Sequence, residues 1–338
     1  MTSERVEHTQ NSYGMRKGAR EFPMMCVLSF VYICNARCPN CPYNNSDIRE
    51  TYRDSLLMPE GIFKTIADQC GQYNTYIRIS GGGEPMLHPK AVELMEYAKR
   101  KNARVGLITN GSLFTAESLY RLVHVGVDMI EFSVDAEDEV TYAMVRPGLD
   151  WKGLLEHAGK AVKIRNEVKS QTKIIASVIN QKGVDVKKAE KFWSRIVDEV
   201  QIRKYLTWGY VEDLSADATP YLEPEERIPC PWLFERLNID TRGDVTICGE
   251  DIAFKEKFAN VRDMSLREIW YHPQLEYFRK KHLARKGDEI PICKSCPDWK
   301  YRSWKHNYWK ILETAEKKRI HKLRKLQVQG MEESIKDS

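Results

Sequence analysis

Short apolar runs alternate with longer amphipathic segments from about residue 24 to residue 206. This alternation is typical of strand–helix units and a parallel sheet. Six strands are expected, at Met24–Tyr32, Tyr76–Ser80, Arg104–Thr109, Met129–Val134, Lys173–Ile179 and Glu199–Lys204. Five helices are expected between them, at Pro59–Cys70, Pro89–Lys101, Ala116–Val125, Trp151–Val168 and Val186–Ile196. Right-handed crossovers would curl such a sheet toward a barrel, with the chemistry in the loops that follow the strands.

The alternation ends after Thr207, where a proline-rich segment begins that includes Pro220 and Pro231. Beyond it, Leu237 to Cys248 has the pattern of a β-hairpin with a turn at Arg242-Gly243-Asp244. We therefore expect an α/β protein in four parts. These are a flexible N-terminus (1–22), a partial parallel (β/α)6 barrel (23–215), a small Cys-rich domain with a β-hairpin (216–300), and a basic helical tail with a disordered end (301–338).

The overall composition agrees with a large folded core. Of the 338 residues, 42% are hydrophobic and 30% are charged, near the averages for soluble globular proteins. The stretch Met24–Cys34 is only about half of the ~20 residues that cross a bilayer. The polar N-terminus lacks the features of a secretory signal. We expect a cytoplasmic protein with no membrane span.

Charge is unevenly distributed along the chain. The net charge is +5, but Lys300 to Lys325 holds ten Lys or Arg and two Glu, a local +8, which leaves −3 elsewhere. Such a segment can bind nucleic acid or an acidic membrane surface. The favoured interpretation is a solvated helix that packs on the body through Trp304, Trp309, Leu312 and Leu323.

The cysteines carry the most specific information. There are nine, at positions 26, 34, 38, 41, 70, 230, 248, 293 and 296. An odd number in a chain without an export signal argues against a disulfide framework. Three lie within eight residues and four lie between Cys230 and Cys296, while Cys26 and Cys70 stand alone.

The first group, Cys34-Asn-Ala-Arg-Cys38-Pro-Asn-Cys41, follows the first expected strand. Three thiolates are too few for a usual structural zinc site, but they hold a [4Fe–4S] cluster with one iron open. This arrangement resembles the radical S-adenosylmethionine superfamily, in which that iron binds the amino and carboxylate groups of the cofactor. The family often has an aromatic residue before the third cysteine. Here Asn40 stands there, and Tyr43 is the nearby candidate for packing on the adenine.

Further motifs follow the other strands in register. Ser80-Gly81-Gly82-Gly83-Glu84-Pro85 combines glycines that permit close backbone approach with a carboxylate that can accept a hydrogen bond from an ammonium group. In the family, the corresponding motif binds the methionine amino group. The resemblance implies cofactor contacts from Gly81, Gly82, Gly83, Glu84, Pro85, Asn110, Ser133, Asp135 and Ser177. Arg146 is a candidate for the cofactor carboxylate or the substrate, with a plain surface arginine given equal weight.

The second group reads Cys230-x12-Gly243-x4-Cys248 and then, after 44 residues, Cys293-x2-Cys296. On spacing alone, zinc and iron–sulfur are equally compatible with four thiolates. After a barrel of this kind, the pattern resembles the twitch form of the SPASM extension. The resemblance implies one auxiliary [4Fe–4S] cluster on Cys230, Cys248, Cys293 and Cys296, whose closed coordination favours electron transfer.

The resemblance also implies the chemistry. An external flavodoxin- or ferredoxin-type reductant would start cleavage of S-adenosylmethionine to a 5′-deoxyadenosyl radical, which removes hydrogen from a substrate C–H. Our leading interpretation is an oxidoreductase that converts a polyhydroxylated small molecule, a sugar or aminocyclitol, to a ketone. Neither Cys26 nor Cys70 is placed to return hydrogen, which favours dehydrogenation over epimerisation. Arg146, Glu212 and Asp213 are catalytic candidates on position alone.

Several alternatives stay open. One is a radical epimerase or decarboxylase of a sugar or nucleoside. Another is a ribosomal peptide maturase, disfavoured because only some 23 residues precede the first strand, or an activase of a partner protein. The last, with nucleic acid disfavoured as a partner, is a zinc-containing nucleic-acid-binding protein that stacks bases on Trp299, Tyr301, Trp304, Tyr308 and Trp309.

Overall fold

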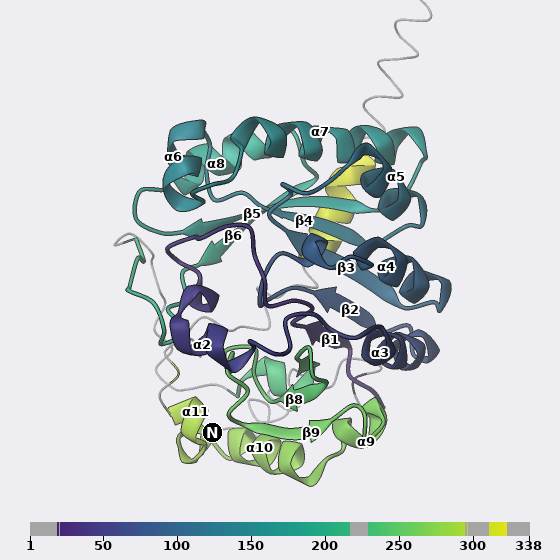
Figure 1. Cartoon of the computed structure of the whole chain (residues 1–338), viewed down its shortest axis with the longest axis vertical. Helices are drawn as coiled ribbons and strands as arrows, with labels where there is room; N and C mark the ends of the chain where they lie inside the picture. Colours follow the sequence, from purple (N-terminus) through teal and green to yellow (C-terminus); the bar gives the residue numbers. More distant parts are fainter. Residues whose placement is uncertain (1–18, 20, 217–228, 295, 297–310, 323–338) are drawn as a thin grey trace, which may run out of the picture.

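The computed structural model describes residues 19, 21–216, 229–294, 296 and 311–322. Its centre is one nine-stranded sheet in the order β6-β5-β4-β3-β2-β1-β7-β8-β9 (Figure 1). The first six strands are parallel, and their bounds are β1 Met25–Leu28, β2 Tyr76–Ile79, β3 Arg104–Thr109, β4 Met129–Ser133, β5 Lys173–Asn180 and β6 Glu199–Lys204. The parallel α/β architecture expected from the sequence is confirmed.

Helices connect these strands and cover the outer face of the sheet (Figure 1). They are α3 Glu60–Gln72, α4 Ala91–Arg100, α5 Ala116–His124, α7 Trp151–Glu167 and α8 Val186–Trp193. Short polar side chains fix several starts: Asp150, for example, accepts hydrogen bonds from the amides of Lys152 and Gly153 at the first turn of α7. Within the barrel, two further helices were not expected, α2 Ser46–Thr51 and α6 Glu139–Val145.

Strand register decides which side chains face the barrel interior. Cys26, Leu28, Ile77 and Ile79 pack under the outer helices in the main core. Because successive side chains alternate across a strand, Val27 and Arg78 between them face the other way. These two residues are also paired in register. The inner face is therefore lined by odd positions of β1 and even positions of β2.

A C-terminal helix at residues 311–322 closes the amino-terminal end of this inner face. Leu312 and Ala315 pack against Met25, Tyr76, Met129 and Ile175, which lie at or near the starts of four strands. The helix is drawn in yellow against the sheet in Figure 1. Ion pairs join Lys173 to Glu316 at 3.1 Å and Lys318 to Glu199 at 2.9 Å. The expected packing of Leu312 on the body is confirmed, whereas Trp304, Trp309 and Leu323 lie outside the described residues, as do the other aromatic residues of the proposed stacking set.

The C-terminal region contains η3 Pro231–Phe234, β7 Arg236–Ile239, β8 Asp244–Thr246, β9 Lys257–Asn260, α9 Leu266–Trp270, α10 Pro273–Leu283, η4 Gly287–Glu289 and α11 Pro291–Lys294. The expected hairpin is present as β7 and β8. The hairpin is not separate from the barrel, however, because β7 pairs in parallel with β1, with Val27 opposite Asn238. The Cys-rich region therefore extends the barrel sheet and supplies one wall of its interior.

Two other structural findings bear on the sequence expectations. Ala19 and Phe22, assigned to a flexible N-terminus, are buried, and the Trp270 indole donates a hydrogen bond to the Ala19 carbonyl at 2.8 Å. Residues 1–18, 20, 217–228, 295, 297–310 and 323–338 lie outside the described residues. Within the described ranges, no helix is both long and apolar enough to cross a membrane.

Candidate active site

Cys34, Cys38 and Cys41 lie in the loop between β1 and η1 Pro42–Asn44. All three are free thiols; Cys38 is buried and the other two are partly buried. The Cys41 amide donates to the Cys38 carbonyl, and the Ala36 amide donates to the Cys34 sulfur at 3.5 Å. Burial raises the pKa of each thiol, that of Cys41 to about 12. Metal binding would therefore have to displace protons from these sulfurs.

The donor set fits an iron–sulfur cluster better than a single ion. A lone tetrahedral ion needs its ligands to converge on one point. Over residues 21–216, 229–294 and 296, no three His, Cys, Asp or Glu side chains are grouped in that way. Thiolates of a cluster bind separate irons and can stand further apart. The three thiols of this loop thus suit a cluster.

The glycines after β2 allow two segments of backbone to touch. Gly81 and Gly82 have φ of 84° and 75°, in the left-handed region. A Cβ on Gly82 would lie 2.0 Å from the Val31 carbonyl oxygen, and one on Gly83 would lie 1.9 Å from that of Ile33. The glycine run therefore holds the strand end against the start of the cysteine loop, so the close approach predicted at these residues is made by the chain itself.

Glu84 is buried beside that contact, with 2% of its surface exposed. Its carboxylate accepts hydrogen bonds from the Thr109 hydroxyl and the Asn110 amide, both at 2.7 Å, and from the Met86 amide at 3.1 Å. Burial raises its pKa, and these bonds oppose that rise. These three hydrogen bonds hold the Glu84 carboxylate in one position. Because a carboxylate has about four acceptor positions, it can accept a hydrogen bond from one more donor.

Asn110 connects the loop after β3 to the cysteine loop. Its side-chain amide donates to Asn35, which lies between Cys34 and Cys38, at 2.9 Å. Asn35 in turn donates to the Ser112 hydroxyl at 2.8 Å, and Ser112 donates back to Asn110 at 2.7 Å. This closed set of hydrogen bonds fixes the position of the cysteine loop relative to β3.

Arg146, which caps α6, reaches the cysteine loop from the opposite side. It donates to the Asp135 carboxylate at 2.6 Å and lies 3.8 Å from the Cys38 sulfur. Burial alone would lower the pKa of Arg146, but the Asp135 carboxylate overrides that effect and raises it. Asp135 has a positive φ of 51° and is also held by the Ile179 amide at 2.7 Å. Arg146 is thus a permanent cation beside Cys38 and not a surface residue.

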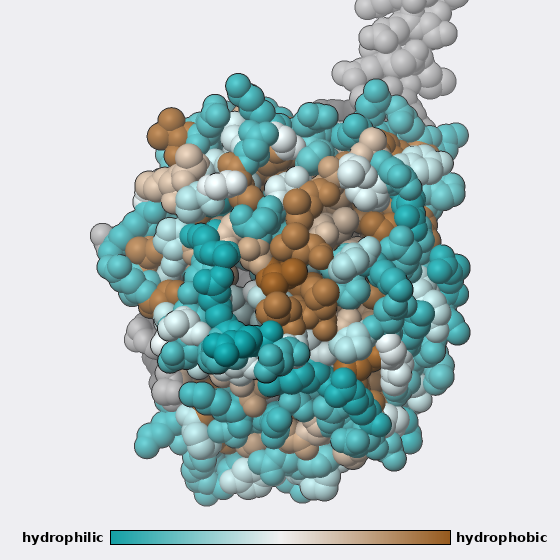
Figure 2. Space-filling model, viewed as in Figure 1, coloured by the Kyte–Doolittle hydropathy of each residue, from teal (hydrophilic) through white to brown (hydrophobic). Residues whose placement is uncertain are grey.

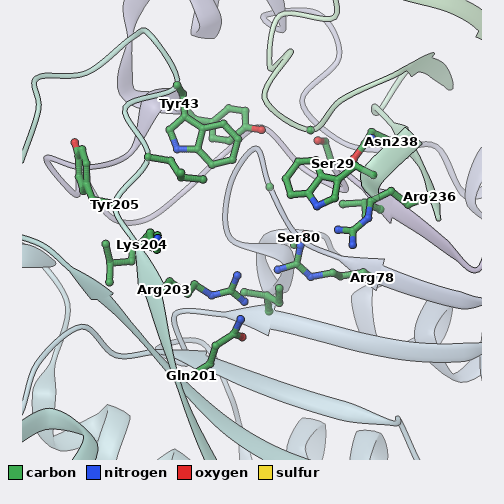
Figure 3. Close-up of a pocket in the computed structure, with 18 of the residues that line it drawn as sticks. Ser29, Tyr43, Arg78, Ser80, Gln201, Arg203, Lys204, Tyr205, Arg236 and Asn238 are labelled. Atoms are coloured by element: carbon green, nitrogen blue, oxygen red, sulfur yellow. The ribbon is translucent and has the colours of Figure 1, made fainter. Parts of the chain in front are cut away.

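A cavity of about 510 Å³ lies between the inner face of the barrel and the C-terminal region (Figure 3). It is lined from the barrel by Ser29, Tyr43, Arg78, Ser80, Gly81, Gln201, Arg203, Lys204 and Tyr205, and from the C-terminal region by Trp232, Glu235, Arg236 and Asn238, among others. Hydrophobic residues, drawn in brown, gather at the centre of the face seen in Figure 2, surrounded by hydrophilic residues. The cavity is of a size that small-molecule sites commonly have.

The structure brings most predicted cofactor residues to the same end of the sheet. Tyr43 and Gly81 line the cavity. Ser133 and Ser177 are paired across β4 and β5 in register, and the buried Asp135 follows Ser133 by two residues. Of the remaining predicted cofactor residues, Gly82, Gly83, Glu84, Pro85 and Asn110 surround the contact described above.

Two predicted catalytic residues are not at the cavity. Glu212 and Asp213 are exposed, and neither lines it. The Asp213 carboxylate instead accepts hydrogen bonds from Ser215, which lower its pKa. Cys26 and Cys70 are also away from it, buried under α3 with their sulfurs 3.7 Å apart.

Sequence reasoning missed the charged residues inside the barrel. Arg78 interrupts an otherwise apolar strand, and Gln201 and Arg203 alternate with outward residues along β6. Arg236 and Asn238 alternate in the same way along β7. Polar residues at every second position of a buried strand were the signal that would have found them.

Four other cysteines, Cys230, Cys248, Cys293 and Cys296, lie in the C-terminal region. Cys230 precedes η3, Cys248 follows β8, and Cys293 lies in α11. His282 connects two of them: its Nδ1 accepts from the Cys230 amide at 3.2 Å and its Nε2 lies 3.4 Å from the Cys293 sulfur. The Glu250 amide donates to Cys248 at 3.4 Å. Four thiols from three segments of the C-terminal region, held by local hydrogen bonds, suit a closed cluster.

Sequence comparisons identify both parts of this arrangement. Residues 28–181 match the family model described as the radical SAM superfamily, and residues 230–297 match that of an iron-sulfur cluster-binding domain, SPASM. The chain belongs to the radical S-adenosylmethionine superfamily of enzymes. Within it, the chain is a member with a C-terminal auxiliary-cluster domain, as its two cysteine groups predicted.

Curated relatives match most of the chain. The tungsten-containing aldehyde ferredoxin oxidoreductase cofactor-modifying protein of Pyrococcus furiosus is 26% identical over 318 residues, covering 78% of this chain and 84% of the relative. The PqqA peptide cyclase of Gluconobacter oxydans is also 26% identical, covering 83% of this chain and 84% of the relative.

Solved structures share the fold. Streptococcus suis SuiB bound to S-adenosylmethionine superposes with a TM-score of 0.63 at 18% identity, covering 83% of this chain and 72% of that one. BtrN in complex with AdoMet and 2-DOIA gives 0.53 at 17% identity, covering 81% and 92%. At these identities the likeness concerns the fold.

Proposed function

We propose that this enzyme modifies a peptide, by removing hydrogen from a residue held in the cavity between the barrel and the C-terminal region. The proposal is supported by the relatives that match along most of the chain. Five of these relatives are PqqA peptide cyclases, at 24–26% identity. These comparisons support the peptide alternative better than the sugar or aminocyclitol dehydrogenase that the sequence first suggested.

The residues divide the work in the following way. When bound, the two clusters and S-adenosylmethionine supply a radical that removes hydrogen and an acceptor for the electron left behind. Cys34, Cys38 and Cys41 would hold the first cluster, and Cys230, Cys248, Cys293 and Cys296 would hold the auxiliary one. Arg146 places a fixed positive charge beside Cys38. The cavity walls exclude water and position the substrate.

The test compares substrate classes directly. Anaerobically reconstituted enzyme is incubated with S-adenosylmethionine and a reductant, together with either a library of synthetic peptides or a panel of sugars and aminocyclitols. We expect peptide-dependent formation of methionine and 5′-deoxyadenosine, and peptide products lighter by two hydrogen atoms. Turnover with a sugar or aminocyclitol and none with peptides would contradict the proposal.

Glu84 is proposed to bind the amino group of S-adenosylmethionine, since its rigid carboxylate has capacity for one more donor. Replacing Glu84 by Gln is expected to weaken S-adenosylmethionine binding at least about tenfold, because a charge-assisted hydrogen bond becomes a neutral one. Anaerobic equilibrium dialysis measures the Kd. The control is Glu60→Gln, which removes an exposed carboxylate that pairs with Lys90. Unchanged affinity in Glu84→Gln would exclude this role.

Lys204 is a candidate base for the proton that the substrate must lose. It lines the cavity at the end of β6, and burial lowers its pKa to about 8. An amine accepts a proton only when neutral, so kcat should rise as pH increases through about 8 and level off above it. We expect Lys204→Met to lose this rise together with most of kcat, while the exposed Lys188→Met control keeps both. The same pH profile in Lys204→Met and wild type would remove Lys204 from the mechanism.

A further inference from the structure

The residues that line the cavity carry an excess of positive charge. Arg78 reaches the cavity from β2 and Arg236 reaches it from β7, on either side of β1 (Figure 3). Arg203 and Lys204 approach from β6 across the cavity. Among the described lining residues these four cations face one carboxylate, that of Glu235. The buried carboxylate of Glu131 lies beneath Arg203 and pairs with it.

The charge of Arg236 is weakly compensated. Its side chain is 7% exposed, and its contact with Glu235 is long, at 3.4 Å. Its Nε has no hydrogen-bond partner in the described part of the chain. Burial lowers the pKa of Arg236 to about 10; the Glu235 carboxylate opposes this effect and the neighbouring Arg78 adds to it. Burying a guanidinium with so few partners lowers the stability of the protein unless an anion binds next to it.

Asn238 adds a second unsatisfied donor on the same face. It lies two residues along β7 from Arg236, is 4% exposed and lines the cavity. Its side-chain nitrogen likewise lacks a hydrogen-bond partner among the described residues. Two buried donors and a second guanidinium thus converge on one side of the cavity. This arrangement matches an oxyanion, which accepts several hydrogen bonds at once.

We propose that Arg236, Arg78 and Asn238 form a binding site for an oxyanion, a carboxylate or a phosphate, carried by the substrate. This inference rests on the proposed function for the identity of the molecule, an acidic peptide. The ring of Trp232 lies 4.8 Å from the Arg236 guanidinium and holds it in place. The anion would anchor the substrate against the C-terminal wall and leave its reacting C–H toward Tyr43 and Ser29.

Arg236 has one competing role, as a counter-charge for the auxiliary cluster, because the Cys230 thiol contributes to its electrostatic surroundings. The two roles predict different measurements. A substrate-binding arginine changes ligand affinity and KM, whereas a cluster counter-charge changes the cluster's reduction potential.

The test uses the anaerobically reconstituted holoenzyme and three small probes: glutarate, inorganic phosphate and the neutral analogue glutaramide. Binding is followed by tryptophan fluorescence, since Trp232 and Trp208 both line the cavity. We expect saturable binding of glutarate or phosphate, whichever oxyanion the site prefers, and none of glutaramide. Arg236→Gln and Arg78→Gln should each weaken that binding at least about tenfold, with Arg236→Lys in between.

The control is Arg267→Gln in α9, which removes a guanidinium that lies over the ring of Tyr271 away from the cavity. It should bind the anion as wild type does. Iron content and circular dichroism of each variant establish that it is folded and loaded.

Three outcomes would overturn the inference: no saturable anion binding by the wild type, equal binding of glutaramide, or unchanged affinity in Arg236→Gln with a shifted potential of the auxiliary cluster. The proposed function is tested apart from it. Anion binding without turnover of any peptide would contradict the proposed function alone. Turnover of a peptide with the same KM in Arg236→Gln as in wild type would contradict the anion site alone.

Discussion

Replacing Cys38 by Ala is expected to lower the iron content by about four atoms per chain and to reduce cleavage of S-adenosylmethionine to background. Cys38 is the most buried of the three thiols in the loop, and Arg146 lies 3.8 Å from its sulfur. Without the Cys38 thiolate, only two thiolates of the loop would be left to bind a cluster. Iron analysis and the yield of 5′-deoxyadenosine under reducing conditions measure the two effects.

The matched variant is Cys296→Ala in the auxiliary group. It removes a cysteine of similar chemistry, also partly shielded from solvent, from the C-terminal region. We expect it to keep measurable cleavage of S-adenosylmethionine while losing the substrate product. Equal loss of cleavage in both variants would argue against separate roles for the two cysteine groups.

The second large effect is expected from Gly82→Ala. The new Cβ would lie 2.0 Å from the Val31 carbonyl oxygen at a position with φ of 75°. The backbone contact that aligns the cysteine loop with β2 would have to open. We expect the free energy of unfolding to fall by about 3 kcal/mol or more, and iron incorporation to fall with it. Denaturant unfolding and iron analysis measure both.

Gly126→Ala separates steric contact from backbone strain. Gly126 has the same φ of 75°, but a Cβ there would meet nothing within 4 Å. Its cost should be about 1 kcal/mol, from the left-handed backbone alone, with normal iron content. If the two alanine variants were equally stable and equally loaded with iron, the contact at Gly82 would not be what positions the loop.

Strong local patterns made much of the barrel predictable. Each of the six expected strands and five expected helices is present, most within one to three residues of its expected ends. Some strands could be identified because both of their faces are apolar. Others could be identified because they begin or end at turn residues, such as Asn102 before β3 and Gly126 before β4. The short helix α6 was missed because Glu139–Val145 is only seven residues long.

The inner wall of the cavity could not be predicted from the sequence, because it is formed by strand pairings that no local pattern reveals. The parallel pairing of β7 with β1 joins residues more than 200 positions apart, and it brings Arg236 and Asn238 to the same face of the sheet as Arg78. A sequence in which Arg-Leu-Asn-Ile follows a turn predicts a strand but not its neighbour. The helix at 311–322 was likewise expected, but its packing against the first residues of the barrel strands was not.

The candidate site residues differ in the same way: those in local motifs were predictable, and those placed by long-range packing were not. The cysteine loop and the Gly81–Glu84 segment were found because each motif is contained within a few consecutive residues. Glu212 and Asp213 were chosen for their place after the last strand, and the structure leaves both exposed to solvent. Position along the chain after β6 does not determine which side chains turn inward.

The central claim is that Cys34, Cys38 and Cys41 hold a four-iron cluster whose open iron takes S-adenosylmethionine beside Glu84. The most direct test is electron paramagnetic resonance of the reduced Cys296→Ala protein, with and without S-adenosylmethionine labelled with ¹⁵N in its amino group. We predict a reduced-cluster signal that changes on addition of the cofactor and a resolved coupling between the cluster spin and the ¹⁵N nucleus. A cluster signal that the cofactor leaves unchanged, with no ¹⁵N coupling, would contradict the account.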